Sequence, residues 1–405
     1  MKRSRSIPAL LPLLLLGAAC ADLSPVEPGE GRPAAFASGA AAGRYVVVLH
    51  DGADPRAVAA VAGVHPRFVY TAALTGFAAE LNGGQLQALR HLPAVAYVEE
   101  DVRGGLVTTQ FNPPSWGINR IDDPDLPMDL TYIYTSAGSG VTAYVLDTGI
   151  NRLHQEFANF LTTRASYLPN GSGGDFVGDG YGSAEDCHGH GSHVAGTVGG
   201  TYSGVAKQVR LVAARVVDCG GYGDISMPIA ALDWIAANGR KPAVVNMSLG
   251  YPSSTAMRQA TAAVVNAGYF VTAAAGNGNS LGVPQSACTV SPANTGTAMT
   301  VGATNNQDFE ASFSNYGTCV DLLAPGVNIR SAWIGSTTAT AFRQGTSMAA
   351  PHVAGVGAQY LALYPSASPA AVTAAIKGIA VPNTITLHSS SVSGGTPNLF
   401  LFTNY

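Results

Sequence analysis

Three short segments of the chain gather side chains that could carry out covalent chemistry. Asp147 directly follows an apolar run, three histidines fall within six positions of the segment 186–197, and Ser347 opens the apolar stretch 345–355. A hydroxyl is a weak nucleophile at neutral pH unless a neighbouring base takes its proton, and an acid commonly orients that base. An acid, an imidazole and a hydroxyl would together supply these parts.

Each segment alone also allows a simpler interpretation. Asp147 could only accept backbone hydrogen bonds at a strand end. The cluster of His188, His190 and His193 could bind a metal ion, with Cys187 as a thiolate ligand, although the H-E-x-x-H pattern of zinc hydrolases is missing. The Ser347 hydroxyl could serve as a helix N-cap. Because Ser347 stands in Gly-Thr-Ser-Met-Ala and not in Gly-x-Ser-x-Gly, it is not expected to lie on the nucleophile elbow of an α/β-hydrolase.

The regions around these segments predict the framework that positions them. Apolar, β-branched runs recur, with helical patterns between several of them; the runs are 141–146, 211–217, 244–249, 270–275 and 299–303, and the helical patterns include 227–238 and 255–266. Such alternation predicts an α/β fold in which a parallel sheet is covered by helices on both faces. Parallel sheets place functional groups beyond the carboxyl ends of their strands, where the three segments fall.

A shorter module precedes this framework, from about residue 44 to residue 107. Its apolar patterns follow the order β-α-β-β-α-β, with strands at 45–49, 67–70, 77–81 and 95–98 and helices at 55–64 and 85–92. This order predicts a small α+β, ferredoxin-like unit. The module has no cluster of catalytic residue types and, taken alone, would be a binding module.

The first residues have the pattern of an export signal. Basic residues at positions 2, 3 and 5 precede an apolar stretch that is too short to span a bilayer, so residues 1–21 are interpreted as a signal peptide. Ala19-Cys20-Ala21 fits release by ordinary cleavage, whereas the residues before Cys20 resemble a bacterial lipobox, in which Cys20 would carry a lipid. Residues 22–43 have the composition of a flexible linker.

Composition excludes several classes of protein. Only 11% of the 405 residues are charged and the net charge is −4, so a coiled coil with many charges, a highly charged disordered chain and a nucleic-acid-binding surface are not expected. Five cysteines is an odd number. In an exported chain, four of them, at 187, 219, 288 and 319, could form disulfides in three alternative pairings.

Taken together, the three segments resemble the subtilisin-like serine proteases. The blocks D-T-G, H-G-S-H-V-A-G-T and G-T-S-M-A-A-P-H-V-A-G occur in that family's order, and the resemblance continues through S-L-G, A-A-G-N and F-S-N-Y-G. It covers residues 109–405 and is strongest to the proteinase K and aqualysin-like branch. The resemblance implies the α/β subtilisin-like fold and a secreted serine endopeptidase.

The resemblance also implies a role for each matching residue. Ser347 would be the nucleophile, His190 the general base and Asp147 the residue that orients the base. The Asn277 side chain and the Ser347 backbone N–H would stabilise the oxyanion. The matching substrate-binding segments are Gly220, Gly221 and Tyr222; Ser248, Leu249 and Gly250; and Ala274, Ala275 and Gly276. The last of these would form the floor of an uncharged S1 pocket, which favours cleavage after aromatic or aliphatic residues.

Relatives with cysteines in these blocks pair the two early and the two late ones, which implies Cys187–Cys219 and Cys288–Cys319. A structural calcium ion is implied at Asp321 with the carbonyl oxygens of Pro292 and Asn294, and oxygen ligands of this kind suit Ca²⁺. A second group of carboxylates near the mature start has two interpretations, a further calcium site or solvated turn charges; these are Asp122, Asp125 and Asp129. No organic cofactor is expected.

The resemblance gives the first module a role as an inhibitor and folding template. Residues 44–108 would form a propeptide that inhibits the protease domain 109–405 and is removed by self-cleavage near Thr108 or Thr109. The mature enzyme would be an extracellular or periplasmic monomer acting on proteins and peptides, with a membrane link only through a lipid on Cys20 of the precursor. Two alternatives remain at this point, a zinc hydrolase built on the three histidines and an inactive, propeptide-bound interaction protein.

Overall fold

The chain divides after Val102 into two compact units, and each is described here by itself. The computed structural model describes residues 43–101, 108–158 and 164–405. The predicted signal peptide, Cys20 and all of the predicted linker except Gly43 lie outside the described residues. No helix among the residues that the structure describes is both long and apolar enough to cross a membrane.

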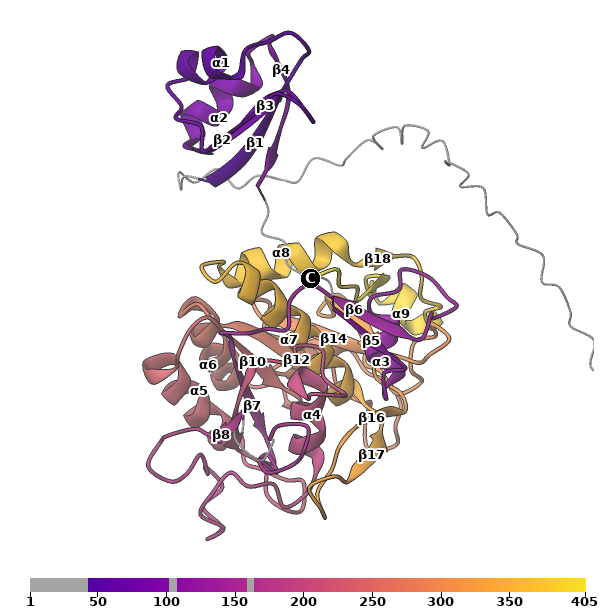
Figure 1. Ribbon diagram of the computed structural model, residues 1–405. Helices are drawn as coiled ribbons and strands as arrows, with labels where there is room; N and C mark the ends of the chain where they lie inside the picture. Colours follow the sequence, from indigo (N-terminus) through magenta and orange to yellow (C-terminus); the bar gives the residue numbers. More distant parts are fainter. Residues whose placement is uncertain (1–42, 102–107, 159–163) are drawn as a thin grey trace, which may run out of the picture. The chain divides into compact units, whose positions relative to one another are not determined.

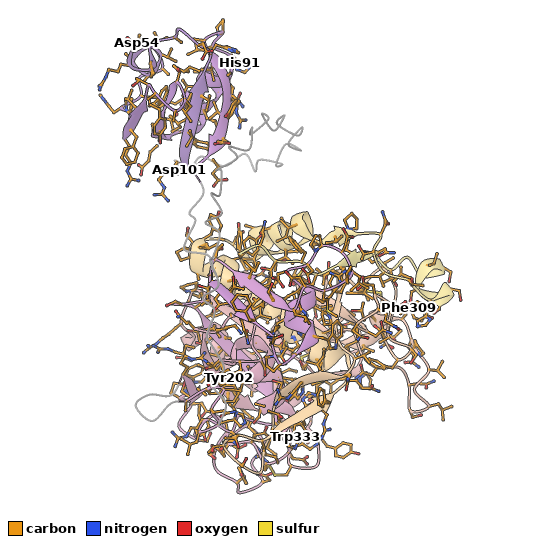
Figure 2. The ribbon with its side chains drawn as sticks, turned by 45° about the vertical axis from the view of Figure 1, so that its right-hand side comes forward. Asp54, His91, Asp101, Tyr202, Phe309 and Trp333 are labelled. Atoms are coloured by element: carbon orange, nitrogen blue, oxygen red, sulfur yellow. A yellow bond between two sulfur atoms is a disulfide. The ribbon has the colours of Figure 1, made fainter. Side chains whose placement is uncertain are left out.

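The first unit has the predicted β-α-β-β-α-β order. Its elements are β1 (Gly43–Leu49), α1 (Pro55–Val61), β2 (Phe68–Tyr70), β3 (Gly76–Leu81), α2 (Gly83–Arg90) and β4 (Val95–Glu100). The four strands form an antiparallel sheet in the order β2-β3-β1-β4, which confirms the ferredoxin-like arrangement (Figure 1). Both helices begin at polar caps, Asp54 for α1 (Figure 2) and Asn82 in a capping box with Gln85 for α2.

The second unit is built on a nine-stranded sheet in which neighbouring strands are parallel, except for the antiparallel pair β18–β19 at one edge. In spatial order the strands are β18 (Val381–Pro382), β19 (Leu399–Phe400), β15 (Leu322–Pro325), β14 (Met299–Thr304), β12 (Phe270–Ala274), β10 (Ala243–Met247), β7 (Thr142–Asp147), β9 (Arg210–Arg215) and β8 (Ala165–Tyr167).

Helices cover both faces of this sheet, as the sequence predicts (Figure 1). Ala143 and Val145 belong to the hydrophobic cluster shared with α4 (His190–Gly199), α7 (Thr346–Leu363) and α8 (Pro369–Ile379). The alternating residues Tyr144 and Leu146 belong to a second cluster, shared with α5 (Ser226–Asn238) and α6 (Thr255–Asn266). Because β7 is buried on both sides, its run is continuously apolar and does not alternate with polar residues.

Smaller elements complete the second unit. Three two-stranded ribbons pair β5 (Thr108–Phe111) with β6 (Thr131–Tyr134), β11 (Tyr251–Pro252) with β13 (Val290–Ser291), and β16 (Ile329–Ala332) with β17 (Thr340–Arg343); the remaining helices are α3 (Trp116–Arg120), the 3₁₀ turn Ala287–Thr289 and α9 (Ser389–Ser393). The disulfides Cys187–Cys219 and Cys288–Cys319 are both present, in the pairing that the resemblance implies.

Candidate active site

The residues predicted to do chemistry lie at one edge of the large sheet, beyond the carboxyl ends of its strands. Asp147 is the last residue of β7, Ser248 directly follows β10, and Asn277 follows β12. These three strands are parallel neighbours. His190 is the first residue of α4 and Ser347 the second of α7, and these two helices pack together against the same face of the sheet.

Two adjoining cavities connect these residues. Asp147 and His190 line a cavity of about 370 Å³, and Ser347 and Asn277 line one of about 550 Å³. The segment 249–251 lines both cavities. The acid, the imidazole, the hydroxyl and the amide therefore line two cavities that share a wall, although Asp147 and Ser347 lie 200 positions apart in the chain.

Asp147 and His190 form a short, directed contact. The Nδ1 atom of His190 lies 2.7 Å from Oδ1 of Asp147, whose side chain is 1% exposed, whereas 27% of the His190 side chain is open to solvent. Burial lowers the pKa of His190, but the charge of Asp147 and its hydrogen bond raise it, and the net pKa lies above the ordinary value. Since Asp147 accepts a hydrogen bond from the Nδ1–H group, Nε2 remains the basic nitrogen of the neutral ring.

The entry to α4 sets the position of His190. Asp186 accepts hydrogen bonds from the backbone N–H groups of His188, Gly189 and Ser192 at 2.8–3.0 Å, and from the Thr148 hydroxyl at 2.8 Å. Its negative charge lies at the positive end of the helix dipole. The predictions from sequence give Asp186 no role. An acid four residues before the histidine, at a helix start, was the available signal.

Gly189 is required where the chain turns into α4. Its φ is 105°, a conformation that side chains rarely adopt, and a Cβ there would lie 2.6 Å from the ring of Trp333. Trp333 directly follows β16 (Figure 2). The glycine pattern of this segment therefore reflects close packing around His190, so it does not indicate a flexible metal-binding loop.

The Ser347 backbone is held by a contact outside its own helix. Pro351, four residues further along α7, has no N–H to donate to the Ser347 carbonyl oxygen. The Ser248 hydroxyl donates to that oxygen instead, at 2.8 Å, and itself accepts from Asn246 Nδ2 at 2.9 Å. The Ser347 hydroxyl donates to the Ser248 carbonyl at 3.3 Å. No hydrogen bond between Ser347 and His190 is present in the described part of the chain.

Asn277 and the start of α7 enclose a small donor-lined space. The Asn277 side-chain oxygen accepts from the backbone N–H and the hydroxyl of Thr346, at 2.8 and 2.9 Å, which leaves its amide nitrogen free to donate elsewhere. A Cβ built on Gly345 would lie 3.3 Å from that nitrogen and 3.6 Å from the Ser347 backbone nitrogen. Both nitrogens therefore border the space beside Gly345, which could hold a small oxyanion.

Asn315 is a further positioning residue that sequence reasoning missed. Its side chain accepts from the N–H groups of Gly278 and Gln285 at 3.0 and 2.8 Å, and donates to the Ala275 carbonyl at 2.9 Å. These bonds fix the loop that carries Asn277. The F-S-N-Y-G block contains Asn315, but its contacts join segments about 40 residues apart and no spacing predicts them.

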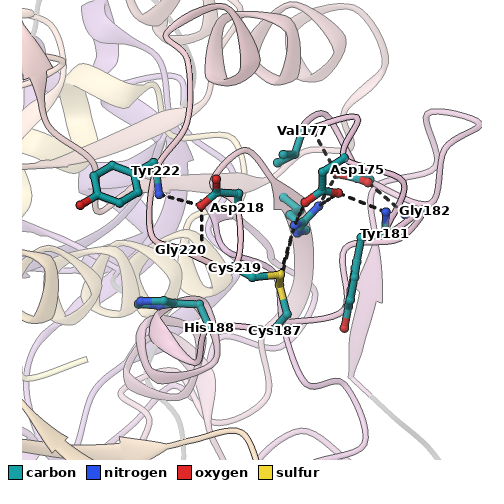
Figure 3. Close-up of polar contacts among 12 residues, drawn as sticks. Asp175, Val177, Tyr181, Gly182, Cys187, His188, Asp218, Cys219, Gly220 and Tyr222 are labelled. Carbon is teal, nitrogen blue, oxygen red and sulfur yellow. Dashed lines mark hydrogen bonds and ion pairs between the residues drawn. A yellow bond between two sulfur atoms is a disulfide. The ribbon is translucent and has the colours of Figure 1, made fainter.

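A tight turn shapes the wall of the smaller cavity. Asp218 Oδ1 accepts from the N–H groups of Gly220 and Tyr222 at 2.8 and 2.9 Å (Figure 3). Tyr222 is 78% exposed and, with Gly221, lines the cavity beside His188. Gly220 does not line it. An aromatic side chain this open has a free face for a ligand.

Buried Arg215 stabilises the segments that carry this turn. The Arg215 side chain, completely buried at the end of β9, pairs with Asp175 at 3.0 Å and with Asp179 at 2.6 Å. Its guanidinium also lies 3.6–3.7 Å from the sulfur atoms of Cys187 and Cys219. The guanidinium therefore ties the histidine segment and the turn before Tyr222 to one loop. Sequence reasoning missed Arg215 as well.

The larger cavity has an uncharged lining. Four of the residues expected to bind substrate, Leu249, Gly250, Ala274 and Gly276, line it, and Val290 adds an apolar wall. Ser248 lines the smaller cavity, and Leu249 and Gly250 border both. Ala275, by contrast, is fully buried in a separate hydrophobic cluster and lines neither. The cavity favours an apolar side chain because no carboxylate or cation lies in its lining to pair with a charged one.

The remaining histidines do not form a metal site. His193 is buried and its Nε2 donates to the carbonyl oxygens of Ile329 and Ala341, and burial lowers its pKa to about 3. His352 is also buried and has a pKa lowered to about 4. Within residues 43–101, 108–158 and 164–405, no three His, Cys, Asp or Glu side chains converge to hold a metal ion. The zinc interpretation is therefore wrong.

The same finding favours the second interpretation of Asp122, Asp125 and Asp129, as turn charges. Asp122 accepts from the Ile133 N–H at 2.6 Å, and Asp129 accepts from the N–H and hydroxyl of Thr131 at 2.8 and 2.7 Å. One oxygen of Asp122 and one of Asp129 thus stabilise the turn before β6, and no group of three such side chains that could hold a metal ion is found among the described residues.

The expected calcium ligands around Asp321 also do not fit a divalent ion. Lys377 Nζ lies 3.1 Å from Asp321 Oδ1, and the Thr300 N–H donates to Oδ2 at 2.9 Å. The Pro292 carbonyl accepts from the Thr295 N–H at 2.8 Å, and no contact places the Asn294 carbonyl near Asp321. An ammonium group occupies the position beside the carboxylate that a metal ion would need.

Comparisons with known proteins agree with this geometry. The profile of the Subtilase family matches residues 138–396, and that of Peptidase inhibitor I9 matches residues 44–104. The chain is 44% identical to an extracellular serine proteinase of Thermus sp. (strain Rt41A), over 98% of both chains. It is 45% identical to proteinase T of Parengyodontium album, over 66% of this chain and 86% of that one.

A solved structure resembles the fold as well. The crystal structure of a cold adapted subtilisin-like serine proteinase superposes with a TM-score of 0.65 at 42% identity, and the match covers 72% of this chain and 98% of that one. The matched share is close to the size of the second unit alone.

Proposed function

Because the chain belongs to the subtilase family of serine endopeptidases, we propose that Asp147, His190 and Ser347 are its catalytic triad. The Ser347 hydroxyl oxygen attacks the scissile carbonyl carbon while His190 Nε2 takes its proton. The C–N bond then breaks, and His190 returns the proton to the leaving amine. Asp147 holds the ring through Nδ1 and stabilises the imidazolium that forms. Water then hydrolyses the acyl-enzyme by the same route.

The tetrahedral intermediate carries a negative oxygen that requires donors in place beforehand. We propose that the Asn277 amide nitrogen and the Ser347 N–H supply them. Their shared position beside Gly345 supports this assignment. In enzymes of this family, the loss of one such donor lowers kcat by about 10²–10³-fold. The contacts of the Asn277 oxygen with Thr346 fix the amide orientation before substrate arrives.

The observation that carries this proposal is the 2.7 Å contact between His190 and buried Asp147 at the cavity that adjoins Ser347. A fluorophosphonate probe tests it. We expect irreversible, stoichiometric inactivation, with the adduct on Ser347 by peptide mass spectrometry. An adduct elsewhere, or full activity after labelling, would contradict the triad. Labelling also separates an active enzyme from an inactive interaction protein.

We propose that the enzyme cleaves proteins and peptides after aromatic or aliphatic residues. The uncharged lining of the 550 Å³ cavity supports an apolar P1 side chain, and exposed Tyr222 supports an apolar contact further along the peptide. The substrate would pair with backbone at 220–222 and 248–250 as an added strand. Cleavage of a peptide library tests this, and a preference for arginine or aspartate at P1 would contradict it.

We propose that residues 44–108 act as an intramolecular inhibitor and folding template, that self-cleavage near Thr108 or Thr109 releases the protease 109–405, and that the mature enzyme is an exported monomer. The match of residues 44–104 to an inhibitor family supports the first point. The relative from Thermus is named as extracellular, which supports export. N-terminal sequencing of the active enzyme locates the cut.

A further inference from the structure

We propose that Lys377 replaces the calcium ion beside Asp321, so that this corner of the protease is held by a cation belonging to the chain. The Lys377 ammonium lies 3.1 Å from Oδ1 of Asp321, the carboxylate expected to bind calcium. The lysine lies 56 residues further along the chain, which is why no local pattern revealed it. The resemblance predicts the acid but has no place for a cation from another helix.

Both oxygens of the carboxylate are engaged, Oδ2 by a backbone N–H and Oδ1 by Lys377, so only loss of the lysine would free one of them. Asp321 Oδ2 accepts from the Thr300 N–H, and the Asp321 N–H donates to the Thr300 carbonyl at 2.8 Å, so the acid is fixed between β14 and β15. The Pro292 carbonyl is engaged by Thr295. Calcium takes six to eight oxygen ligands. Lysine presents three donors and no acceptor, so it competes with the ion and cannot help to bind it.

Charge favours the same conclusion. The expected ligand set contains a single carboxylate, and one ammonium neutralises it. Calcium–oxygen distances are about 2.3–2.6 Å, so an ion on the same oxygen would lie at most about 5.7 Å from Nζ. At that separation the calcium ion and the ammonium group repel each other. The side chains of Lys377 and Asp321 are only 37% and 26% exposed, so solvent screens this repulsion only in part.

The position of Lys377 in the fold makes this contact persistent. It lies in the last turn of α8, where a positive charge is favoured by the helix dipole. Val372 and Ile376 of the same helix are buried in the main core, which anchors the lysine backbone. The ion pair therefore joins α8 to the edge of β15, two residues after disulfide-bonded Cys319. A chelator cannot remove a cation that is part of the chain.

Calcium-dependent unfolding of four variants tests the proposal. All carry Ser347→Ala in the full chain, to prevent self-digestion, so the outcome does not depend on the proposed catalytic mechanism. Melting temperatures are compared in excess calcium and in EDTA. We expect Asp321→Asn to leave the calcium response of the parent unchanged. We expect Lys377→Met, which keeps an apolar stem of similar length, to gain a calcium-dependent increase of at least about 2 °C.

Two controls test whether the calcium-dependent increase in the melting temperature of Lys377→Met arises at Asp321. Adding Asp321→Asn to Lys377→Met should abolish it. Lys241→Met should not produce it, because the Lys241 ammonium bonds a backbone carbonyl and lies over the Tyr269 ring, with no carboxylate partner among the residues that the structure describes. Calcium stoichiometry by isothermal titration provides a second measurement that does not need the lysine variant to fold. The parent and Asp321→Asn should bind equal numbers of ions. One ion fewer in Asp321→Asn, or no calcium response in well-folded Lys377→Met, would overturn the proposal.

Discussion

The two units of the chain bury their sheets to very different extents. In the first unit, β4 has no fully buried residue and Tyr97 on it is 53% exposed. In the second unit, every residue of β7 is buried. In the first unit, the sheet and its two helices share one small cluster of eight buried apolar residues. In the second unit, the sheet lies between two larger clusters, one on each face.

Buried polarity differs even more than buried area. Among residues 43–101, 108–158 and 164–405, every buried polar or charged side chain belongs to the second unit. Polar groups away from water must be hydrogen-bonded, and a thick, closely packed core fixes their geometry. A two-layer unit of about 60 residues has a small core and low stability, which suits the proposed role of a propeptide that is later removed. A three-layer unit can hold an Asp–His pair, a buried arginine and a donor-lined pocket in fixed relative positions.

The largest expected effect tests whether the second unit cleaves off the first. Ser347→Ala should lower kcat by about 10⁶-fold, the size of the loss when the nucleophile is removed in this family. The purified chain should then keep residues 44–108, and gel mobility with intact mass measures this. The wild-type chain processed in parallel is the control. Efficient cleavage near Thr108 in the variant would show that another protease removes the first unit.

The next effect tests the thin core of the first unit. Phe77 is fully buried in β3, so Phe77→Ala should cost about 3–5 kcal/mol, close to the whole stability expected of a domain this small. We expect the first unit to be unfolded and the yield of active protease to fall. Limited proteolysis of the Ser347→Ala chain measures the unfolding. Phe68→Ala, at a side chain 52% exposed in β2, should leave yield and protection unchanged.

The smallest effect tests the electrostatics of the second unit. The base must be neutral to act, so kcat/KM should rise as pH increases through the raised pKa of His190. The positive charge of Arg343 lowers that pKa, so Arg343→Gln should move the rising limb to higher pH. Arg258→Gln, which removes a cation that bonds only hydroxyls on and before α6, is the matched control. A shift to lower pH in Arg343→Gln would contradict the assignment of His190 as the base.

Much of the architecture could be predicted because its signals are local. The runs at 141–146 and 299–303 each fall within one residue of a strand, and the helical pattern 255–266 coincides with α6. The positions of Asp147, His190 and Ser347 at strand and helix ends follow from those patterns together with the family resemblance. The pairing of the four cysteines could come only from the resemblance, since the residues alone left three connectivities open.

What could not be predicted depends on contacts between distant segments. The Lys377–Asp321 pair, the two acids on Arg215 and the bonds of Asn315 each join residues about 30 to 60 positions apart, with no pattern to mark the partners. The predicted carboxylate cluster failed for a related reason. Nearness in sequence placed Asp122 and Asp129 in one turn, but one oxygen of each accepts a hydrogen bond from a different backbone N–H.

The proline in α7 has a consequence for the order in which this site can change over evolution. Ser248→Ala alone would orphan the Ser347 carbonyl, at a cost of about 1–3 kcal/mol, because Pro351 cannot supply the missing hydrogen bond. If Pro351→Ala came first, the helix would provide a spare donor, and the loss of the hydroxyl would become tolerable. Positions 248 and 351 are therefore epistatic, and the substrate-binding segment can diversify at Ser248 most easily in a lineage that has already lost the proline.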